Sequence, residues 1–451
     1  MEKGNKKIIR GWVFYDWANS VYNLVISSAI FPIFYDTVTT NNFKARFFKT
    51  TVDKAKELDL PEGVAVTVDF LGVQVSNSVL LSFVLSASFL LVSFLSPMLS
   101  GIADYTGSKK KFMRFFCYLG SLACISLFWF NPEHMELGML SVFLGSIGFW
   151  NSLVFYNAFL PEIADKQDQD KISARGFSMG YFGSMLLLVL CLVWIQVFEL
   201  PTKWCFVFVG LWWIGFSQVT YSALPNNVYG RKPKRGLWRG FRELYIVYRK
   251  FKKTRRLKKY LYSFFFFNTG VQTVMLMATI FASKEINWSK GDEKSGLIIA
   301  ILLIQILGAL GAFIMSRLSG KIGNIKTLMI SISIWLIICV GAYFITTPVQ
   351  FYFLAATVGL VMGGVQAIAR STYSKFLPET KDHASYFSFY DVTEKLGIVL
   401  GTFFFGIIEA ITGDLRFSVI SIGVFFLAGF ILLWFVPKEE RVLRRPVGIN
   451  E

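Results

Sequence analysis

The sequence predicts an all-α polytopic membrane protein, because of its composition, its apolar windows and the placement of its basic residues. Of the 451 residues, 54% are hydrophobic and only 17% are charged, which is too apolar for a soluble protein of this size. A helix needs about 20 apolar residues to cross about 30 Å of hydrocarbon. Windows of that kind begin near residues 10, 75, 112, 136, 174, 204, 259, 294, 327, 350, 384 and 416. Twelve transmembrane helices follow.

Lysine and arginine recur on alternate loops of this arrangement. They gather at Lys109 to Lys111, in the segment 231–259, around Lys321 and at the C-terminal end of the chain. The positive-inside rule then predicts that both termini are cytoplasmic. We expect a monomer that spans a bacterial inner membrane.

A carboxylate lies inside the first apolar window. Asp16, Asn19 or Ser20, and Asn23 are spaced so that they share one face of a helix. A charge at membrane depth costs several kcal/mol or more, so it usually faces a watery cavity. Two readings stay open, because Asp16 is only about 9 Å along the helix axis from Arg10. It lines a solute pathway, or it is an interfacial carboxylate paired with a lysine or arginine.

A repeated string indicates that the chain is a duplication. YNAFLPE, from Tyr156 to Glu162, recurs as YSKFLPE, from Tyr373 to Glu379, and the same offset of 217 carries Gly180 onto Gly397. The alternative is a common helix-ending Pro-Glu turn. Duplication predicts an N-terminal six-helix half, a basic cytoplasmic linker with an amphipathic helix, a C-terminal six-helix half and a cytoplasmic tail, at residues 1–224, 225–258, 259–437 and 438–451.

The eleventh predicted helix carries three charges inside one apolar span. Asp391 and Lys395 are four residues apart and share a face with Ser388, and Glu394 adjoins Lys395. An internal salt bridge is therefore expected. It is either a purely structural pair or a site where a carboxylate takes up a proton, and both acids are candidates.

Other polar side chains lie in the predicted spans. Asn268 and Gln272 are the best placed, because by the duplication the seventh helix is the counterpart of the first. Gln366 joins them from the tenth helix. Each of these alone is also explained by a helix-to-helix hydrogen bond. Arg370, at the end of the tenth helix, is either a positive-inside anchor or a partner of Asp391 or Glu394.

The linker is strongly basic. Residues 231–259 hold fourteen Lys or Arg against the single acid Glu243, so this segment supplies most of the net charge of +17. Its large apolar residues recur at helical spacing, which predicts an amphipathic helix on anionic membrane lipids. A nucleic-acid partner is not expected, because a basic stripe beside transmembrane helices already has a lipid partner.

The turn after the second helix resembles a loop of the major facilitator superfamily. Ser100 to Lys110 reads like G-x-x-x-D-(R/K)-x-G-(R/K)-(R/K), and Gly320 to Lys326 resembles its weaker second copy. The positions that match, expected with Arg370 to gate a conformational change, are Gly101, Asp104, Gly107 and Lys109. The departures are Ser100, Tyr105, Ser108 and, at the acid of the second copy, Gly320. They leave the charge network of the loop open, and the plain alternative is a tight turn with positive-inside lysines.

Longer strings resemble one branch of that superfamily. FYDWANSVYN, SARGFSMGYFGS, GGVQAIARSTYSKFLPE and SFYDVTEKLGIVLG are together similar to the vacuole effluxer, autophagy-related protein 22-like family. Two positions depart from the family pattern: Ser388 stands where a glycine is expected, and Thr402 where a proline is common. The resemblance implies the major facilitator fold and the transport of a small solute, with amino acids first because fungal members are associated with amino-acid export. It also implies functional roles for Tyr15 to Ser20 and for Phe389 to Lys395, including Tyr390.

We therefore expect a secondary active transporter that works by alternating access, with protons as the coupling ion. The alternatives are a sugar:cation symporter of the same fold and a non-transporting receptor or scaffold. The sequence contains no Walker-type phosphate loop, no catalytic triad and no cluster of metal ligands. We expect no enzymatic reaction, no cofactor and no metal.

Overall fold

The computed structural model describes residues 3–61, 64–226, 236–289 and 293–438, and within them twelve helices are long and apolar enough to cross a membrane. The predicted number of spans is confirmed. The first six spans, here called the first group, contain α1 (Lys6–Val21), η1 (Tyr22–Ala29), α2 (Ile30–Phe47), α4 (Asn77–Thr106), α5 (Lys109–Ser126), η2 (Leu127–Trp129), η3 (Pro132–His134), α6 (Met135–Asn157), α7 (Leu160–Ile163), α8 (Gln169–Gln196) and α9 (Lys203–Ala223). The last six, the second group, are α11 (Arg255–Glu285), α12 (Glu293–Ile322), α13 (Asn324–Phe344), α14 (Pro348–Phe376), α15 (His383–Thr412) and α16 (Leu415–Trp434).

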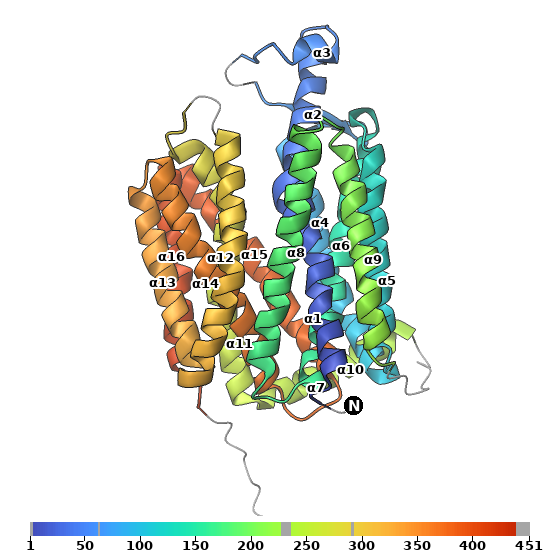
Figure 1. Cartoon of the computed structure of the whole chain (residues 1–451), viewed down its shortest axis with the longest axis vertical. Helices are drawn as coiled ribbons and strands as arrows, with labels where there is room; N and C mark the ends of the chain where they lie inside the picture. The colour runs from blue at the N-terminus through green and yellow to red at the C-terminus, as the bar shows by residue number, and fades with distance from the viewer. Residues whose placement is uncertain (1–2, 62–63, 227–235, 290–292, 439–451) are drawn as a thin grey trace, which may run out of the picture.

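The two groups stand side by side with their helices roughly parallel (Figure 1). We call one end of the molecule the basic end, because it carries the N-terminus, the helix α10 (Gly236–Lys253) and the turn from α4 to α5. The groups meet where α8 packs on α12 and α14, and where α4 packs on α15. Residues from α1, α4, α6 and α8 can therefore contact residues from α12, α14 and α15.

The first span is not a uniform α-helix. Its middle, Tyr22–Ala29, is a π-helix, and α2 continues it. π-Helical turns are rare and are frequent at functional sites. The sequence predicted one regular helix here, so the spacing that placed Asn23 on the face of Asp16 does not hold beyond Val21.

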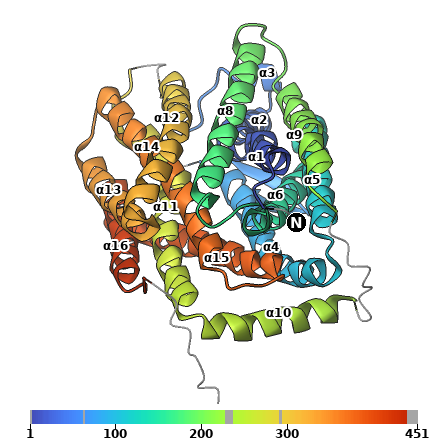
Figure 2. The same ribbon diagram turned by 60° about the horizontal axis from the view of Figure 1, so that its bottom comes forward.

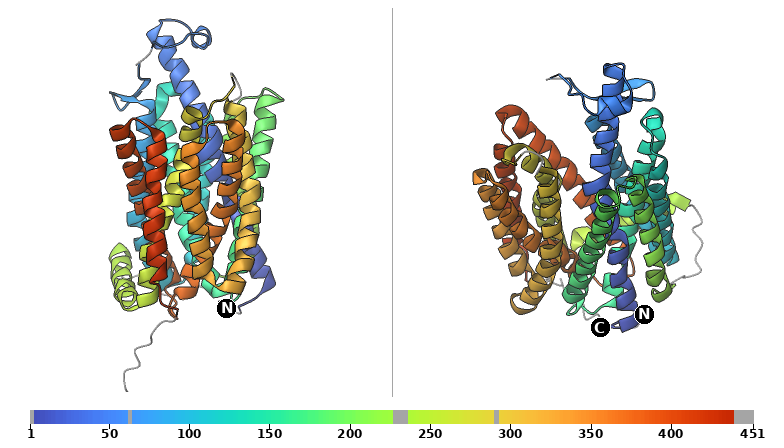
Figure 3. Two further views of the ribbon diagram at one scale, coloured as in Figure 1. Left: turned by 90° about the vertical axis from the view of Figure 1, so that its left-hand side faces the viewer. Right: turned by 45° about the horizontal axis from the view of Figure 1, so that its top comes forward.

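Several regular elements follow the π-helix before the second span begins. The helix α2 continues to Phe47, the short helix α3 (Val52–Ala55) follows, and the strands β1 (Thr67–Phe70) and β2 (Val73–Ser76) form an antiparallel hairpin. Arg46 and Asp69 form an ion pair of 2.5 Å that ties the hairpin to α2. Figure 3 shows this region projecting beyond the helices, at what we call the hairpin end.

The helix α10 lies across the basic end (Figure 2). It forms as predicted from the spacing of its apolar residues. Val247 and Phe251 are buried, and Phe251 stacks on Phe389 of α15 at 5.8 Å, so part of its apolar face is turned to the protein and not to lipid. Residues 227–235 of the predicted linker, and the predicted tail after residue 438, lie outside the described residues.

Candidate functional site

Asp16 is joined to the second group by an ion pair. Its Oδ2 accepts hydrogen bonds from the hydroxyl of Tyr156 at 2.8 Å and from Nη2 of Arg370 at 3.2 Å. Asp16 is 4% exposed and Arg370 is 3% exposed. Arg370 thus pairs with Asp16, and not with Asp391 or Glu394. Of the two readings for Asp16, the paired carboxylate is the one observed, although it is buried between the groups and not interfacial.

The guanidinium of Arg370 is held on several sides. Nε donates to Oγ of Ser173 at 2.9 Å, and Nη2 donates to the carbonyl of Ser173 at 2.9 Å. The ring of Phe177 lies 4.1 Å from its central carbon, and that of Trp12 lies 4.9 Å away. A side chain at Gly176 would collide with the Asp16 carboxylate. The contact therefore depends on close approach of α8 to α1.

A second set of contacts surrounds Asp104 at the end of α4. Its two oxygens accept hydrogen bonds from the backbone N–H groups of Ala384 at 3.1 Å and Ser385 at 2.7 Å, in the first turn of α15. Unpaired N–H groups and the helix dipole favour an anion there. Asp104 thus caps a helix of the second group. Lys109 pairs with Asp104 at 3.6 Å and also with Glu162.

Glu162 extends this set. Its Oε1 lies 2.9 Å from Nδ1 of His383, so the carboxylate joins α7 to the start of α15. The predicted loop therefore forms its charge network despite Tyr105 and Ser108. Gly107 ends α4 in the left-handed conformation at φ 74°, and Gly101 is buried within α4. We call the following residues the first loop network: Asp104, Lys109, Glu162, His383, Ala384 and Ser385.

A third set lies at the corresponding turn of the second group. Oδ2 of Asp170, at the start of α8, accepts hydrogen bonds from Ser319 at 2.8 Å and from Lys375 at 2.6 Å. Its Oδ1 accepts one from Asn324 at 2.7 Å. We call these four residues the second loop network. The acid missing at Gly320 is therefore supplied by the first group.

The three charges of α15 form one cluster near mid-depth. Nζ of Lys395 lies 3.1 Å from Asp391 and 3.5 Å from Glu394, so the predicted ion pair is confirmed. Nζ also lies 3.3 Å from the centre of the Trp150 ring, which belongs to the first group. Gln272 of α11 donates to Glu394 at 2.8 Å. Oδ2 of Asp391 is buried and has no hydrogen-bond partner among the described residues.

The duplicated fold does not require these charges. The offset that relates YNAFLPE to YSKFLPE places Ala174, Phe177 and Ser178 of α8 at the positions of Asp391, Glu394 and Lys395. The matching positions of α8 are therefore occupied by uncharged residues in the same molecule. The cluster is a property of α15 alone, which favours a function over a packing role.

Some other predicted residues lie between the groups. Gln366 accepts a hydrogen bond from Tyr181 at 2.8 Å, which joins α14 to α8. Ser20 is half-buried and Asn23 is exposed, although both lie in the first span. These positions are consistent with a polar path, but they do not contact Asp391 directly.

The remaining predicted residues are buried in packing. Tyr15 lies 5.0 Å from the ring of Tyr156 inside the first group, and Tyr390 stacks on Phe264 at 4.2 Å inside the second. The amide nitrogens of Asn19 and Asn268 are buried, and neither has a hydrogen-bond partner among the described residues. The structure thus divides the predicted set into residues bonded between the groups at the basic end, a charged cluster and packing residues.

The sequence analysis missed several partners of these residues. They are Trp150, Asp170, Ser173, Asn324, Lys375 and His383. Tyr156 and Glu162 were singled out only as members of the repeat, although both bond across the predicted sites. The repeat was a usable signal for them, because it marks both Tyr156, near the end of α6, and Glu162, in α7.

The contacts between the groups are concentrated at the basic end. Among the described residues, the hydrogen bond between the groups that lies nearest the hairpin end runs from the hydroxyl of Ser184 to the side-chain carbonyl of Gln305, at 3.4 Å. A pocket of about 380 Å³ remains between the groups at the basic end, lined in part by Glu162, Ser374 and His383. Among the described residues, hydrogen bonds and ion pairs therefore hold the two groups together at the basic end and not at the hairpin end.

Comparison with known proteins shows what kind of molecule this is. The family model described as "Vacuole effluxer Atg22 like" matches residues 4–442. An uncharacterised MFS-type transporter, YxiO, of Bacillus subtilis is 29% identical over 449 residues, which cover 97% of each chain. Autophagy-related protein 22 of Coccidioides immitis is 24% identical over 513 residues, which cover 91% of this chain and 83% of the relative.

Solved structures agree on the fold. A crystal structure of the major facilitator superfamily transporter FucP in the outward conformation aligns with a TM-score of 0.67 at 12% identity, and covers 97% of this chain and 99% of that one. These relatives and structures are transporters and not enzymes. The chain is a multi-pass integral membrane protein of the major facilitator fold, and it belongs to the Atg22-like vacuole effluxer family.

Proposed function

We propose that this transporter moves small zwitterionic solutes, with amino acids first, by alternating access coupled to protons. The observation that carries the proposal is the cluster of Asp391, Glu394 and Lys395. It is buried, it lies about 18 Å along α15 from His383 at the position of Lys395, and it contacts Trp150 of the other group. Charges at such depth are costly. Where they occur, they usually mark a path for ions or solutes.

The cluster offers a route for proton coupling. A proton on Asp391 removes the negative charge that holds Lys395 at 3.1 Å. Lys395 then keeps Glu394 as its charge partner and can shift relative to Trp150, which changes the contact between the two groups. Proton uptake at one carboxylate thereby biases the relative position of the groups, which is what coupling requires.

Zwitterionic solutes suit the surrounding side chains. A free amino acid presents one ammonium and one carboxylate, and a site for it needs an acceptor and several donors. Glu394, with a side chain 17% exposed, is the acceptor that remains partly accessible. Gln272 beside Glu394, Gln366 between α14 and α8, and the exposed Asn23 of the first span provide amide donors.

We place the basic end at the cytoplasmic side of a bacterial inner membrane and treat the protein as a monomer. The exposed side chains of α10 include Arg249, Lys252 and Lys253, which suit the anionic lipids of an inner leaflet. With this orientation the contacts at the basic end close the cytoplasmic side, and the structure faces outward.

The test is transport by purified protein in proteoliposomes. We expect uptake of a labelled amino acid when a pH gradient is imposed, and exchange of the same amino acid without a gradient. Asp391→Asn should abolish gradient-driven uptake and keep exchange. Glu409→Gln is the matched control, because Glu409 lies on the same helix but pairs with an exposed lysine, Lys284, at 3.4 Å.

The alternatives give different results in this assay. If sugars alone compete for uptake, the amino-acid assignment fails and a sugar:cation symporter replaces it. If no solute moves with or without the gradient, and Asp391→Asn changes nothing, the receptor or scaffold alternative holds. Loss of exchange together with uptake in Asp391→Asn would remove the coupling role and leave a binding or structural one.

A further inference from the structure

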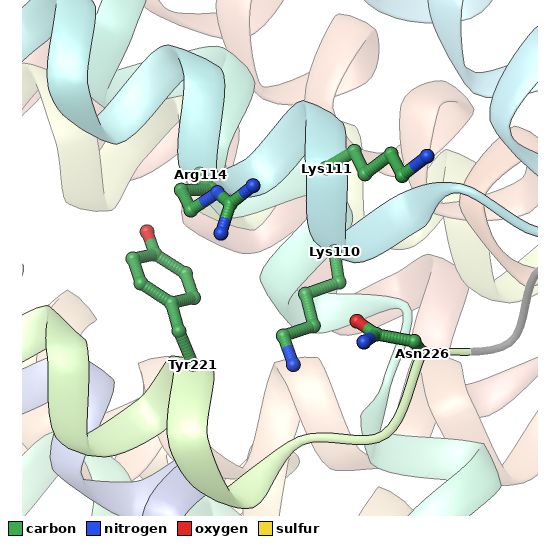
Figure 4. Close-up of a pocket in the computed structure, with 5 residues that line it drawn as sticks. All are labelled: Lys110, Lys111, Arg114, Tyr221 and Asn226. Atoms are coloured by element: carbon green, nitrogen blue, oxygen red, sulfur yellow. The ribbon is translucent and has the colours of Figure 1, made fainter.

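A second, strongly basic pocket lies away from the interface between the groups. It has a volume of about 350 Å³ and is lined by Lys110, Lys111, Arg114, Tyr221 and Asn226. Figure 4 shows Arg114 above Tyr221 and Lys110 beside Asn226, while the ammonium of Lys111 extends away from the other four side chains. Its size lies in the range of about 300–1,000 Å³ that is usual for small-molecule sites. Its described lining residues lie on α5, on α9 and just after α9.

In the part of the chain that the structure describes, the three cations of this pocket have no counter-charge. Among the described residues, no carboxylate lies within ion-pair distance of Lys110, Lys111 or Arg114. Their neighbour Lys109 differs, because it pairs with Asp104 and Glu162. The pocket lining also contains no acidic residue.

The local helix geometry makes this arrangement unfavourable without an anion. Lys110 and Arg114 are four residues apart on α5, where like charges repel. Lys110 and Lys111 also lie in the first turn of α5, where the helix dipole favours negative charge, and that turn contains no acidic residue. A bound anion would offset both effects.

The donors are available for such a ligand. Nζ of Lys110 uses one of its three protons on the carbonyl of Leu224 at 2.6 Å, which holds α5 against the end of α9. Among the described residues, Lys111 and Arg114 donate no hydrogen bond to another protein group. A planar guanidinium with free N–H groups suits the oxygens of a phosphate.

The pocket lies at the edge of a lipid-facing surface. Phe115 and Leu122 of α5 are 61% and 58% exposed, and Val219 of α9 is 46% exposed. In a membrane protein such apolar side chains contact acyl chains, so the cations sit at the depth of the headgroups. A phosphate carried on a lipid can therefore reach the pocket from the side.

We propose that the pocket of Lys110, Lys111, Arg114, Tyr221 and Asn226 binds a phosphate group, either that of an anionic phospholipid headgroup or soluble phosphate. Basic pockets between transmembrane helices bind lipid headgroups elsewhere. The site lies outside the path proposed for the solute, so it is independent of what the protein transports.

The experiment measures the lipid retained by the full-length protein in detergent, by native mass spectrometry, with added phosphatidylglycerol or phosphatidylcholine. The test variant is Lys110→Gln with Lys111→Gln and Arg114→Gln. The control variant is Arg317→Gln with Lys321→Gln and Lys326→Gln, which removes the same charges from exposed positions at the same end. We expect wild type and control to retain phosphatidylglycerol in preference to phosphatidylcholine, and the test variant to lose about tenfold or more of that retention.

Thermal unfolding with inorganic phosphate separates the two sources. A rise in the midpoint of wild type and control, absent in the test variant, would assign soluble phosphate and support the proposal. Equal retention of phosphatidylglycerol by the test variant and the control, or no response of wild type to either probe, would overturn it. Arg114→Lys keeps the charge and checks folding, because it should retain lipid better than the triple variant.

Discussion

The two loop networks close the same end of the molecule with reversed chemistry. In the first, the end of α4 supplies the carboxylate, Asp104, and the start of α15 supplies two backbone N–H donors. In the second, the turn from α12 to α13 supplies the donors Ser319 and Asn324, and the start of α8 supplies the carboxylate, Asp170. Each network joins a carboxylate of the first group to donors of the second group.

The difference shows what the duplication has to keep. A loop can lose its acid, as at Gly320, provided that the facing helix supplies one. What recurs is the contact between a loop of one group and the first turn of a helix in the other. Between the networks lies the pair of Asp16 and Arg370, which has no counterpart, because Leu153 stands at the position of Arg370.

The largest effect should come from breaking that central pair. Arg370→Ala leaves the carboxylate of Asp16 buried without its charge partner, and such a loss costs about 3–5 kcal/mol. We expect the unfolding midpoint of the detergent-solubilised protein to fall, and solute uptake to be lost. Asp16→Asn with Arg370→Gln removes both charges and should recover much of the midpoint. No recovery would show that the pair does not hold this interface.

The next largest effect should come from replacing Asp104 or Asp170. Hydrogen bonds to charged groups are worth about 1.5–3 kcal/mol, so Asp104→Asn and Asp170→Asn should each weaken closure about tenfold or more. Ser374→Cys gives a reporter, because Ser374 is 2% exposed and lines the pocket between the groups. The five native cysteines are buried. Alkylation of the reporter by a charged maleimide should quicken in both variants.

Different results for Asp104→Asn and Asp170→Asn would show that the two networks do not contribute equally to closure. If Asp104→Asn opens the basic end and Asp170→Asn does not, the second network is a surface contact without a gating role. If neither variant changes the alkylation rate, closure rests on the central pair and on apolar packing.

A swap of the carboxylate should cost less than its loss. Asp170→Asn with Asn324→Asp moves the acid onto the loop, as in the first network. Nζ of Lys375 is 3.0 Å from Asn324 and 2.6 Å from Asp170, so it can pair with either position. We expect the double variant to alkylate within about threefold of wild type, because contacting sites couple by about 0.5–3 kcal/mol. If the alkylation rate of the double variant rises by as much as the effects of the two single variants combined, an acid at position 324 does not replace the carboxylate of Asp170.

The sequence predicted the fold far better than it predicted these contacts. Composition and window length reveal the twelve spans, because each helix must be apolar by itself. Asp104 was found because its loop has a local pattern. Asp170 was not found, because its partners lie 149 or more positions away. Arg370 was singled out, but its pairing with Asp16 was not predicted, because the two residues are 354 positions apart.

Two further features left no readable signal. Nothing in the apolar composition of Tyr22–Ala29 marks this segment as a π-helix. The hairpin of β1 and β2 is too short and too mixed in charge to be predicted from alternation. The buried charges of α15 were readable, because an ionisable residue within an apolar span stands out by itself.

We expect the smallest effects from substitutions of the glutamate that ends each copy of the repeated string. Glu162 and Glu379 occupy matching positions, but Glu162 bonds to Lys109 and His383 with a side chain 13% exposed, whereas Glu379 is exposed. Glu162→Gln keeps an acceptor and loses the charge, so it should cost about 1 kcal/mol. Glu379→Gln should stay within about 0.5 kcal/mol, as surface changes do. Thermal midpoints and the alkylation rate of Ser374→Cys measure both, and equal effects would show that Glu162 does not join the groups.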